Sequence, residues 1–137
     1  MTEGTLVFTD AGGPIINEWL DLRWTHVLVW LNGTYYEATP PRVRRSKRFR
    51  ATSFLTLSPS FSPAQVEQMI EYANSQLGRP YSFRGYFYPE LYGKTRGIYC
   101  SEYAGAIMQA GDLPIPYSAG YDPDRLYDSV RILLDTP

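Results

Sequence analysis

The dipeptide Asn32-Gly33 constrains the fold of this 137-residue chain more than any other feature of its sequence. It separates two runs that are rich in β-branched and aromatic residues. A two-residue type I′ turn needs positive φ at both central positions, which Asn and Gly tolerate best. The sequence therefore predicts a β-hairpin with strands over about 25–31 and 34–39.

The register of this hairpin brings the only histidine of the chain near a carboxylate. With a two-residue loop, Leu31 faces Thr34, and side chains that alternate along each strand put His26 and Glu37 on one face. These two residues are diagonal neighbours with Cα atoms about 7 to 8 Å apart, within reach of an imidazole and a long carboxylate side chain. A carboxylate there would fix the tautomer of His26 and favour the imidazolium. The alternative is a histidine on the strand surface near an unrelated glutamate.

The remaining patterns predict an α+β fold in which a small antiparallel sheet packs against helices. Strands are expected over residues 4–9 and 53–58, and the basic run 42–50 is expected to be an exposed or edge strand. A first helix is expected from an N-cap at Ser62, with Pro63 at its first position, Gln65 completing a capping box and Gly78 as its stop.

Other segments of the chain carry weaker signals. A second helix is expected over about 100–110, ended by Gly111, and a helical turn is expected around 15–22. Residues 79–99 are expected to form an aromatic loop, and residues 122–134 a short turn or helix with an apolar end. The whole chain, 1–137, is interpreted as one domain because its length suits a single core.

Composition excludes several classes of protein. One cysteine cannot form an internal disulfide, and one cysteine with one histidine cannot build a Cys/His metal cluster, so neither a metal nor another cofactor is expected. The sequence shows no signal peptide and no run of 18 apolar residues for a transmembrane segment. These features favour a cytoplasmic protein, or one that is released by lysis.

Six of the 13 cationic residues fall within residues 42–50, which leaves the rest of the chain acidic. Such a run usually serves as solvated, solubilising charge, and it contains no dedicated nucleic-acid motif. A more specific interpretation is that this run binds an anion through Arg44, Arg45 and Arg48. A non-catalytic binding module for an anionic partner is therefore one hypothesis for function.

Cys100 lies where the second helix should begin. Unpaired backbone N–H groups and the positive end of the helix dipole stabilise a thiolate at such a position, and the same N–H groups can hold an oxyanion. A lone cysteine is more often a buried structural residue. However, a cysteine, a histidine and a carboxylate suited to orient that histidine match the parts of a thiol nucleophile with its base.

Two segments resemble a known superfamily. LGRPYSFRGYFYPELYGKTRGIYCSEY, residues 77–103, is similar to the segment of NlpC-type papain-like peptidases in which Gly-x-Pro-Tyr precedes a Cys-Ser at the head of the central helix. THVLVWLNGTYYEA, residues 25–38, resembles their histidine-bearing hairpin. The histidine segment comes first here, which is the order of the circularly permuted, YiiX-like branch that has lecithin–retinol acyltransferases as distant relatives. The first strand also resembles that branch, with Thr5 in place of its aspartate.

The resemblance implies a permuted papain-like (NlpC-type) fold with the nucleophile at a helix N-terminus, and a thiol hydrolase or acyltransferase activity. It implies Cys100 as nucleophile, His26 as base and Glu37 as the orienting third member, where ordinary members often carry a second histidine. It also implies that Tyr81 helps bind the oxyanion or substrate, and the backbone at Ser101 is an expected oxyanion donor. Expected substrates are a peptide amide, for example in the cell wall, or a lipid ester or amide.

Overall fold

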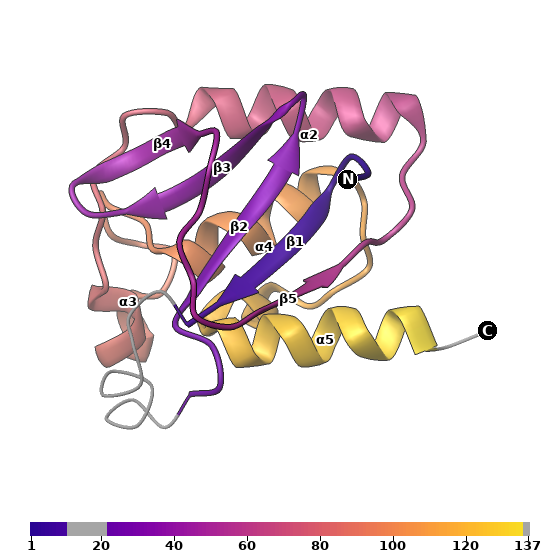
Figure 1. The fold of residues 1–137 in the computed structure, drawn as a ribbon. Coiled ribbons are helices and arrows are strands. Elements are labelled where there is room, and N and C mark those ends of the chain that lie inside the picture. Colours follow the sequence, from indigo (N-terminus) through magenta and orange to yellow (C-terminus); the bar gives the residue numbers. More distant parts are fainter. Residues whose placement is uncertain (11–21, 136–137) are drawn as a thin grey trace.

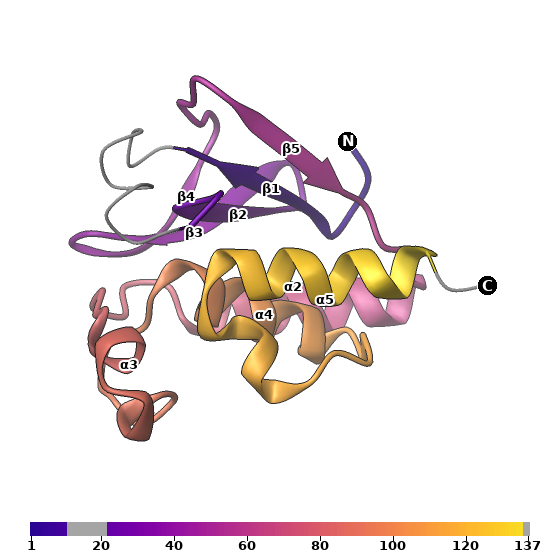
Figure 2. The same cartoon turned by 90° about the horizontal axis from the view of Figure 1, so that it is seen from below.

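A computed structural model describes residues 1–10 and 22–135, which form a small antiparallel sheet with helices packed on one face (Figure 1). Turning the molecule shows two layers, with the strands in one and α2, α4 and α5 in the other (Figure 2). The sheet has the strand order β4-β3-β2-β1-β5, with β1 (Thr5–Thr9), β2 (His26–Leu31), β3 (Thr34–Thr39), β4 (Arg42–Ser46) and β5 (Phe54–Leu57). The helices are α2 (Pro63–Ser75), α3 (Arg84–Phe87), α4 (Cys100–Ala110) and α5 (Pro123–Asp135), with 3-10 turns η1 (Pro89–Leu91) and η2 (Tyr117–Tyr121). The predicted α+β class is confirmed.

The hairpin of β2 and β3 forms as the Asn-Gly signal predicts. Asn32 and Gly33 have φ angles of 52° and 78°, the positive values that this turn requires. The observed register pairs Leu31 with Thr34, Trp30 with Tyr35 and Val29 with Tyr36. The count across a two-residue loop is therefore confirmed.

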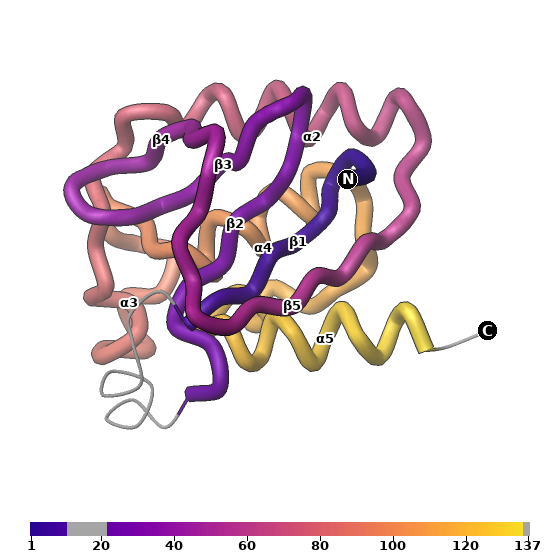
Figure 3. Tube along the Cα trace, in the orientation of Figure 1, coloured from indigo at the N-terminus to yellow at the C-terminus, as the bar shows by residue number. Residues whose placement is uncertain are grey.

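The two faces of the sheet have different surroundings. Alternating residues of β2, such as Val27 and Val29, are buried in the main core that the sheet shares with the helices. The opposite face holds a smaller apolar cluster, in which Phe49 packs edge-on against Tyr35 with ring centroids 5.3 Å apart. Phe49 belongs to the segment 47–53, which runs from β4 at one edge of the sheet to β5 at the other (Figure 3).

The predicted boundaries of the helices α2 and α4 are largely confirmed. Ser62 caps α2, Gln65 completes the capping box, and α4 spans Cys100–Ala110 before Gly111. Gly78 does not end α2 directly, because the C-cap is Gln76 and Gly78, at φ 87°, lies in the turns that follow. The core-facing side of α2 is buried at Met69 and Ala73 and half-buried at Val66 and Ile70, and Leu77, just after the helix, is also half-buried.

Replacing Ser62 by alanine should lower the free energy of unfolding by about 1 kcal/mol, because the Gln65 backbone N–H would lose the hydroxyl that accepts its hydrogen bond. Urea unfolding followed by circular dichroism measures this change. Ser60→Ala is the control, since Ser60 is an exposed serine two residues earlier. An equal loss in both variants would contradict the assignment of the cap.

Two segments contain more helix than the sequence predicted. The expected loop 79–99 contains the short helix α3 and the turn η1, and the expected turn near the C-terminus is the 13-residue helix α5. Leu126 and Val130 are buried along one side of α5, so tertiary packing supports a helix that a short apolar pattern did not define. The helical turn predicted around 15–22 lies, apart from residue 22, outside the described residues. Among the helices of the described part, none is long and apolar enough to cross a membrane.

Candidate active site

The hairpin brings His26 and Glu37 into direct contact. Nε2 of His26 and Oε1 of Glu37 are 2.9 Å apart, and the two side chains are only 15% and 7% exposed. His26 is the first residue of β2, whereas Glu37 lies in the middle of β3, so the contact is the diagonal one that the register predicts. Because Glu37 occupies Nε2, the ring nitrogen Nδ1 is left for another partner.

Cys100 lies beside His26. It is the first residue of α4, it is 2% exposed, and it is near enough to His26 to help raise the pKa of the imidazole. Its Sγ also lies 3.8 Å from the backbone oxygen of Thr25, the residue just before His26. The structure therefore places the only cysteine, the only histidine and a buried glutamate in one continuous row.

The charges in this row support one another. Burial lowers the pKa of His26, but hydrogen bonds and charge interactions with Cys100 and Glu37 outweigh that effect and raise it from 6.5 to about 9. Burial raises the pKa of Glu37, but the hydrogen bond and charge of His26, followed by the charge of Arg44, hold it below its usual value. At neutral pH the arrangement therefore favours an imidazolium held beside an ionised carboxylate.

Backbone pairing connects the residues around Cys100 to the edge of the sheet. The N–H of Val43 in β4 donates to the oxygen of Arg79, and the N–H of Tyr81 donates to the oxygen of Pro41. The same segment also pairs with the chain that leads into α4, because the N–H of Ile98, two residues before Cys100, donates to the oxygen of Pro80. Backbone hydrogen bonds thus hold the segment of Tyr81 between the edge of the sheet and the chain that leads to Cys100.

The two other predicted site residues also lie next to Cys100. Burial raises the pKa of Tyr81, and negative charge at Cys100 raises it further, so the phenol keeps its proton beside the sulfur. Ser101 is fully buried in α4, and its Oγ has no hydrogen-bond partner among the described residues. The role of Ser101 in the prediction rests on its backbone N–H, which belongs to the first turn of a helix.

The basic segment is divided between two environments. Arg44 pairs with Glu37 across β3 and β4, and its Nε lies 3.6 Å from Oε2 of Glu37. Arg45 and Arg48 are exposed, and no ion pair joins either of them to a described carboxylate. The contact of Arg44 with Glu37 was not predicted from the sequence. If Pro40 and Pro41 are taken as a two-residue loop between two strands, the pairing of residues across that loop places Arg44 opposite Glu37.

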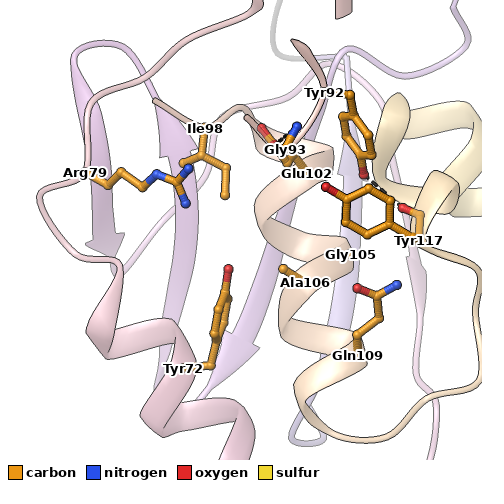
Figure 4. A pocket seen from close by; sticks show the side chains of 10 residues that line it. All are labelled: Tyr72, Arg79, Tyr92, Gly93, Ile98, Glu102, Gly105, Ala106, Gln109 and Tyr117. Carbon is orange, nitrogen blue, oxygen red and sulfur yellow. Dashed lines mark hydrogen bonds between the residues drawn. The ribbon is translucent and has the colours of Figure 1, made fainter. Parts of the chain in front are cut away.

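A cavity of about 130 Å³ lies beside α4 and includes no member of the row described above (Figure 4). Its charged lining residues hold the chain that leads into α4. Arg79 donates to the backbone oxygens of residues 95–97, and Glu102 accepts from the backbone N–H groups of Tyr99 and Gly93. Burial raises the pKa of Glu102. These contacts indicate a structural role for both side chains at the start of α4.

Sequence comparison gives no match to this chain, either among protein-family models or among curated proteins. Among solved structures, the chain is similar to the metalloprotein YiiX from Escherichia coli O157:H7 (DUF1105), with a TM-score of 0.56 and 19% sequence identity. The match covers 80% of this chain and 66% of the YiiX chain. The matched part is therefore slightly less than two thirds of the length of YiiX.

The description of YiiX as a metalloprotein raises the question of a metal in this site. Within residues 1–10 and 22–135, no three His, Cys, Asp or Glu side chains are grouped so that they could hold a metal ion. The donors of the row are also engaged with one another, since Glu37 contacts both His26 and Arg44. These residues do not fit a metal site. What the comparison shows is the fold: a YiiX-like α+β architecture with a small five-stranded antiparallel sheet.

Proposed function

We propose that this protein is a papain-like cysteine hydrolase of the permuted NlpC type, acting through Cys100, His26 and Glu37. The single observation that carries the proposal is the continuous contact from Cys100 at a helix start, through His26, to the buried carboxylate of Glu37. A structural cysteine needs neither an imidazolium beside it nor a carboxylate behind that imidazolium. The same three parts define an activated thiol nucleophile.

The proposed reaction begins with the proton of Cys100 on His26. The thiolate attacks the substrate carbonyl carbon, and the resulting oxyanion accepts hydrogen bonds from backbone N–H groups at Cys100 and Ser101 and from the hydroxyl of Tyr81. His26 gives its proton to the leaving nitrogen or oxygen, which departs and leaves a thioester on Cys100. Water or another acceptor then loses a proton to His26, attacks the thioester and releases the acyl group.

Glu37 acts in this scheme through His26. Its Oε1 accepts a hydrogen bond from Nε2, which directs Nδ1 toward the sulfur and stabilises the imidazolium. The bond that is cleaved is a peptide amide, as in cell-wall peptidases, or an ester or amide of a lipid, as in the acyltransferase relatives. Both substrate classes fit the thioester chemistry.

A panel of peptidyl and acyl compounds distinguishes these substrate classes. The protein is incubated with peptidyl and acyl p-nitroanilides and p-nitrophenyl esters, and the adduct is followed by intact mass spectrometry together with release of the chromophore. We expect one acyl group on Cys100 and turnover of one class, with neither in Cys100→Ala. Turnover that persists in Cys100→Ala, or acylation of another residue, would contradict the proposal.

The competing hypothesis is a binding module that uses the basic segment 42–50 to hold an anionic partner. The exposed side chains of Arg45 and Arg48 are compatible with it. It predicts binding to anionic polymers or vesicles that weakens steeply with salt and is lost when Arg45 and Arg48 are neutralised. The hydrolase proposal predicts catalysis that these changes leave in place.

A further inference from the structure

We propose that Arg44 is a positioning residue of the site, which holds Glu37 ionised and oriented toward His26. The inference rests on the proposed hydrolase function and adds a fourth side chain to its row. It concerns the one cation of the basic segment that the structure brings against a buried carboxylate.

The geometry of Glu37 shows why a second partner is needed. Its side chain is 7% exposed, and burial of a carboxylate is costly unless its oxygens are matched by charge or hydrogen bonds. Oε1 is matched by His26 at 2.9 Å, and Oε2 faces Nε of Arg44 at 3.6 Å. The carboxylate therefore lies between two cations on opposite sides, each directed at a different oxygen.

The sheet fixes Arg44 in this position. β3 and β4 pair Glu37 with Arg44 directly, so both side chains leave the sheet on the same face. Arg45, the next residue, pairs with Tyr36, whose side chain belongs to the main core on the other face. The alternation of β4 thus selects Arg44, and not its neighbour, as the contact of Glu37.

Among the side chains that lower the pKa of Glu37, His26 acts most strongly, followed by the charge of Arg44 and then by Ser46 of β4. Arg44 is 58% exposed, so solvent screens its charge, and its effect should be smaller than that of His26. We therefore expect tuning of the carboxylate by Arg44, with His26 remaining its main partner.

The test uses Arg44→Gln and the charge-preserving Arg44→Lys, with Arg131→Gln as the matched control. Arg131 lies on α5, where it pairs with Asp135 at the surface, so the control also removes one positive charge from an arginine–carboxylate pair. For Arg44→Gln we expect kcat/KM to fall about threefold to tenfold, mainly through kcat, with the acid limb of the pH profile moved to higher pH. Arg44→Lys should recover part of the loss, and Arg131→Gln should match the wild type.

A second measurement does not depend on activity. Carbon-13 NMR of protein labelled at the glutamate carboxyl carbons follows the titration of Glu37, whose signal is identified by its absence in Glu37→Gln. We expect the midpoint of Glu37 to move to higher pH in Arg44→Gln and to stay unchanged in Arg131→Gln. An unchanged midpoint would overturn the inference even if the hydrolase is active. A shifted midpoint in a protein without hydrolase activity would support the contact and contradict the proposed function instead.

The separate effects of the substitution on kcat and on KM distinguish a positioning role of Arg44 from substrate binding. A rise of KM at constant kcat, seen with anionic substrates only, would show that Arg44 binds substrate and would overturn its role as a positioning residue.

Discussion

Replacing His26 by alanine should slow acylation of Cys100 by about 100-fold to 10,000-fold. In the proposed mechanism, the variant removes the group that takes the thiol proton and gives it to the leaving group, while the cysteine and the helix start remain. Single-turnover acylation, followed by intact mass spectrometry with a substrate from the active class, measures this rate. The interpretation is simple because the chain has one cysteine and one histidine.

Two controls accompany this experiment. Thermal unfolding shows whether His26→Ala keeps the fold, and alkylation in denaturant shows that Cys100 remains a free thiol. Acylation of folded His26→Ala at the wild-type rate would mean that the imidazole is not the base of the reaction.

Exchange of Glu37 for glutamine should have an effect of similar size on kcat, a loss of about 100-fold or more. Glutamine keeps the shape of the side chain but removes the charge that stabilises the imidazolium, and its amide can present the wrong group to Nε2. The pKa of His26 should fall from about 9, since the hydrogen bond and the charge of Glu37 both raise it. Steady-state kinetics between pH 5 and about pH 10 measure the loss and the accompanying change of profile.

The same exchange should change how stability depends on pH. A histidine whose pKa is raised in the folded state stabilises the fold fully below its unfolded value of 6.5 and loses that contribution as pH rises through about 9. The advantage of the wild type over Glu37→Gln should therefore shrink across this range. Denaturant unfolding at pH 6 and about pH 9.5 tests this, and an advantage that grows with pH would contradict the assigned direction of the shift.

Local signals predicted the elements that build the site. Asn32-Gly33 defined both a turn and a register, and the register alone put Glu37 beside His26. The start of α4 at Cys100 was also predicted, because a non-helical Gly-Ile-Tyr precedes a helical pattern that ends at Gly111. In each case, residues close together in the sequence set the geometry.

The long-range pairings could not be predicted in this way. The segment at Arg79 and Tyr81 pairs with β4 and with Ile98. These contacts could not be predicted because the aromatic loop has no periodic sequence pattern. The length of α5 was missed for a related reason, since its buried side is defined by the elements against which it packs. Tertiary contacts, which local propensity does not encode, decide both features.

The most direct test of the Cys100–His26–Glu37 row is an NMR titration of the single histidine. The ring signals of His26 are followed against pH in the wild type, in Cys100→Ala and in Glu37→Gln. No other imidazole interferes, because the chain has one histidine. We predict a wild-type pKa of about 9 that falls in both variants, because each removes one of the two partners that raise it. A wild-type value at or below 6.5 that neither substitution changes would contradict the proposed site.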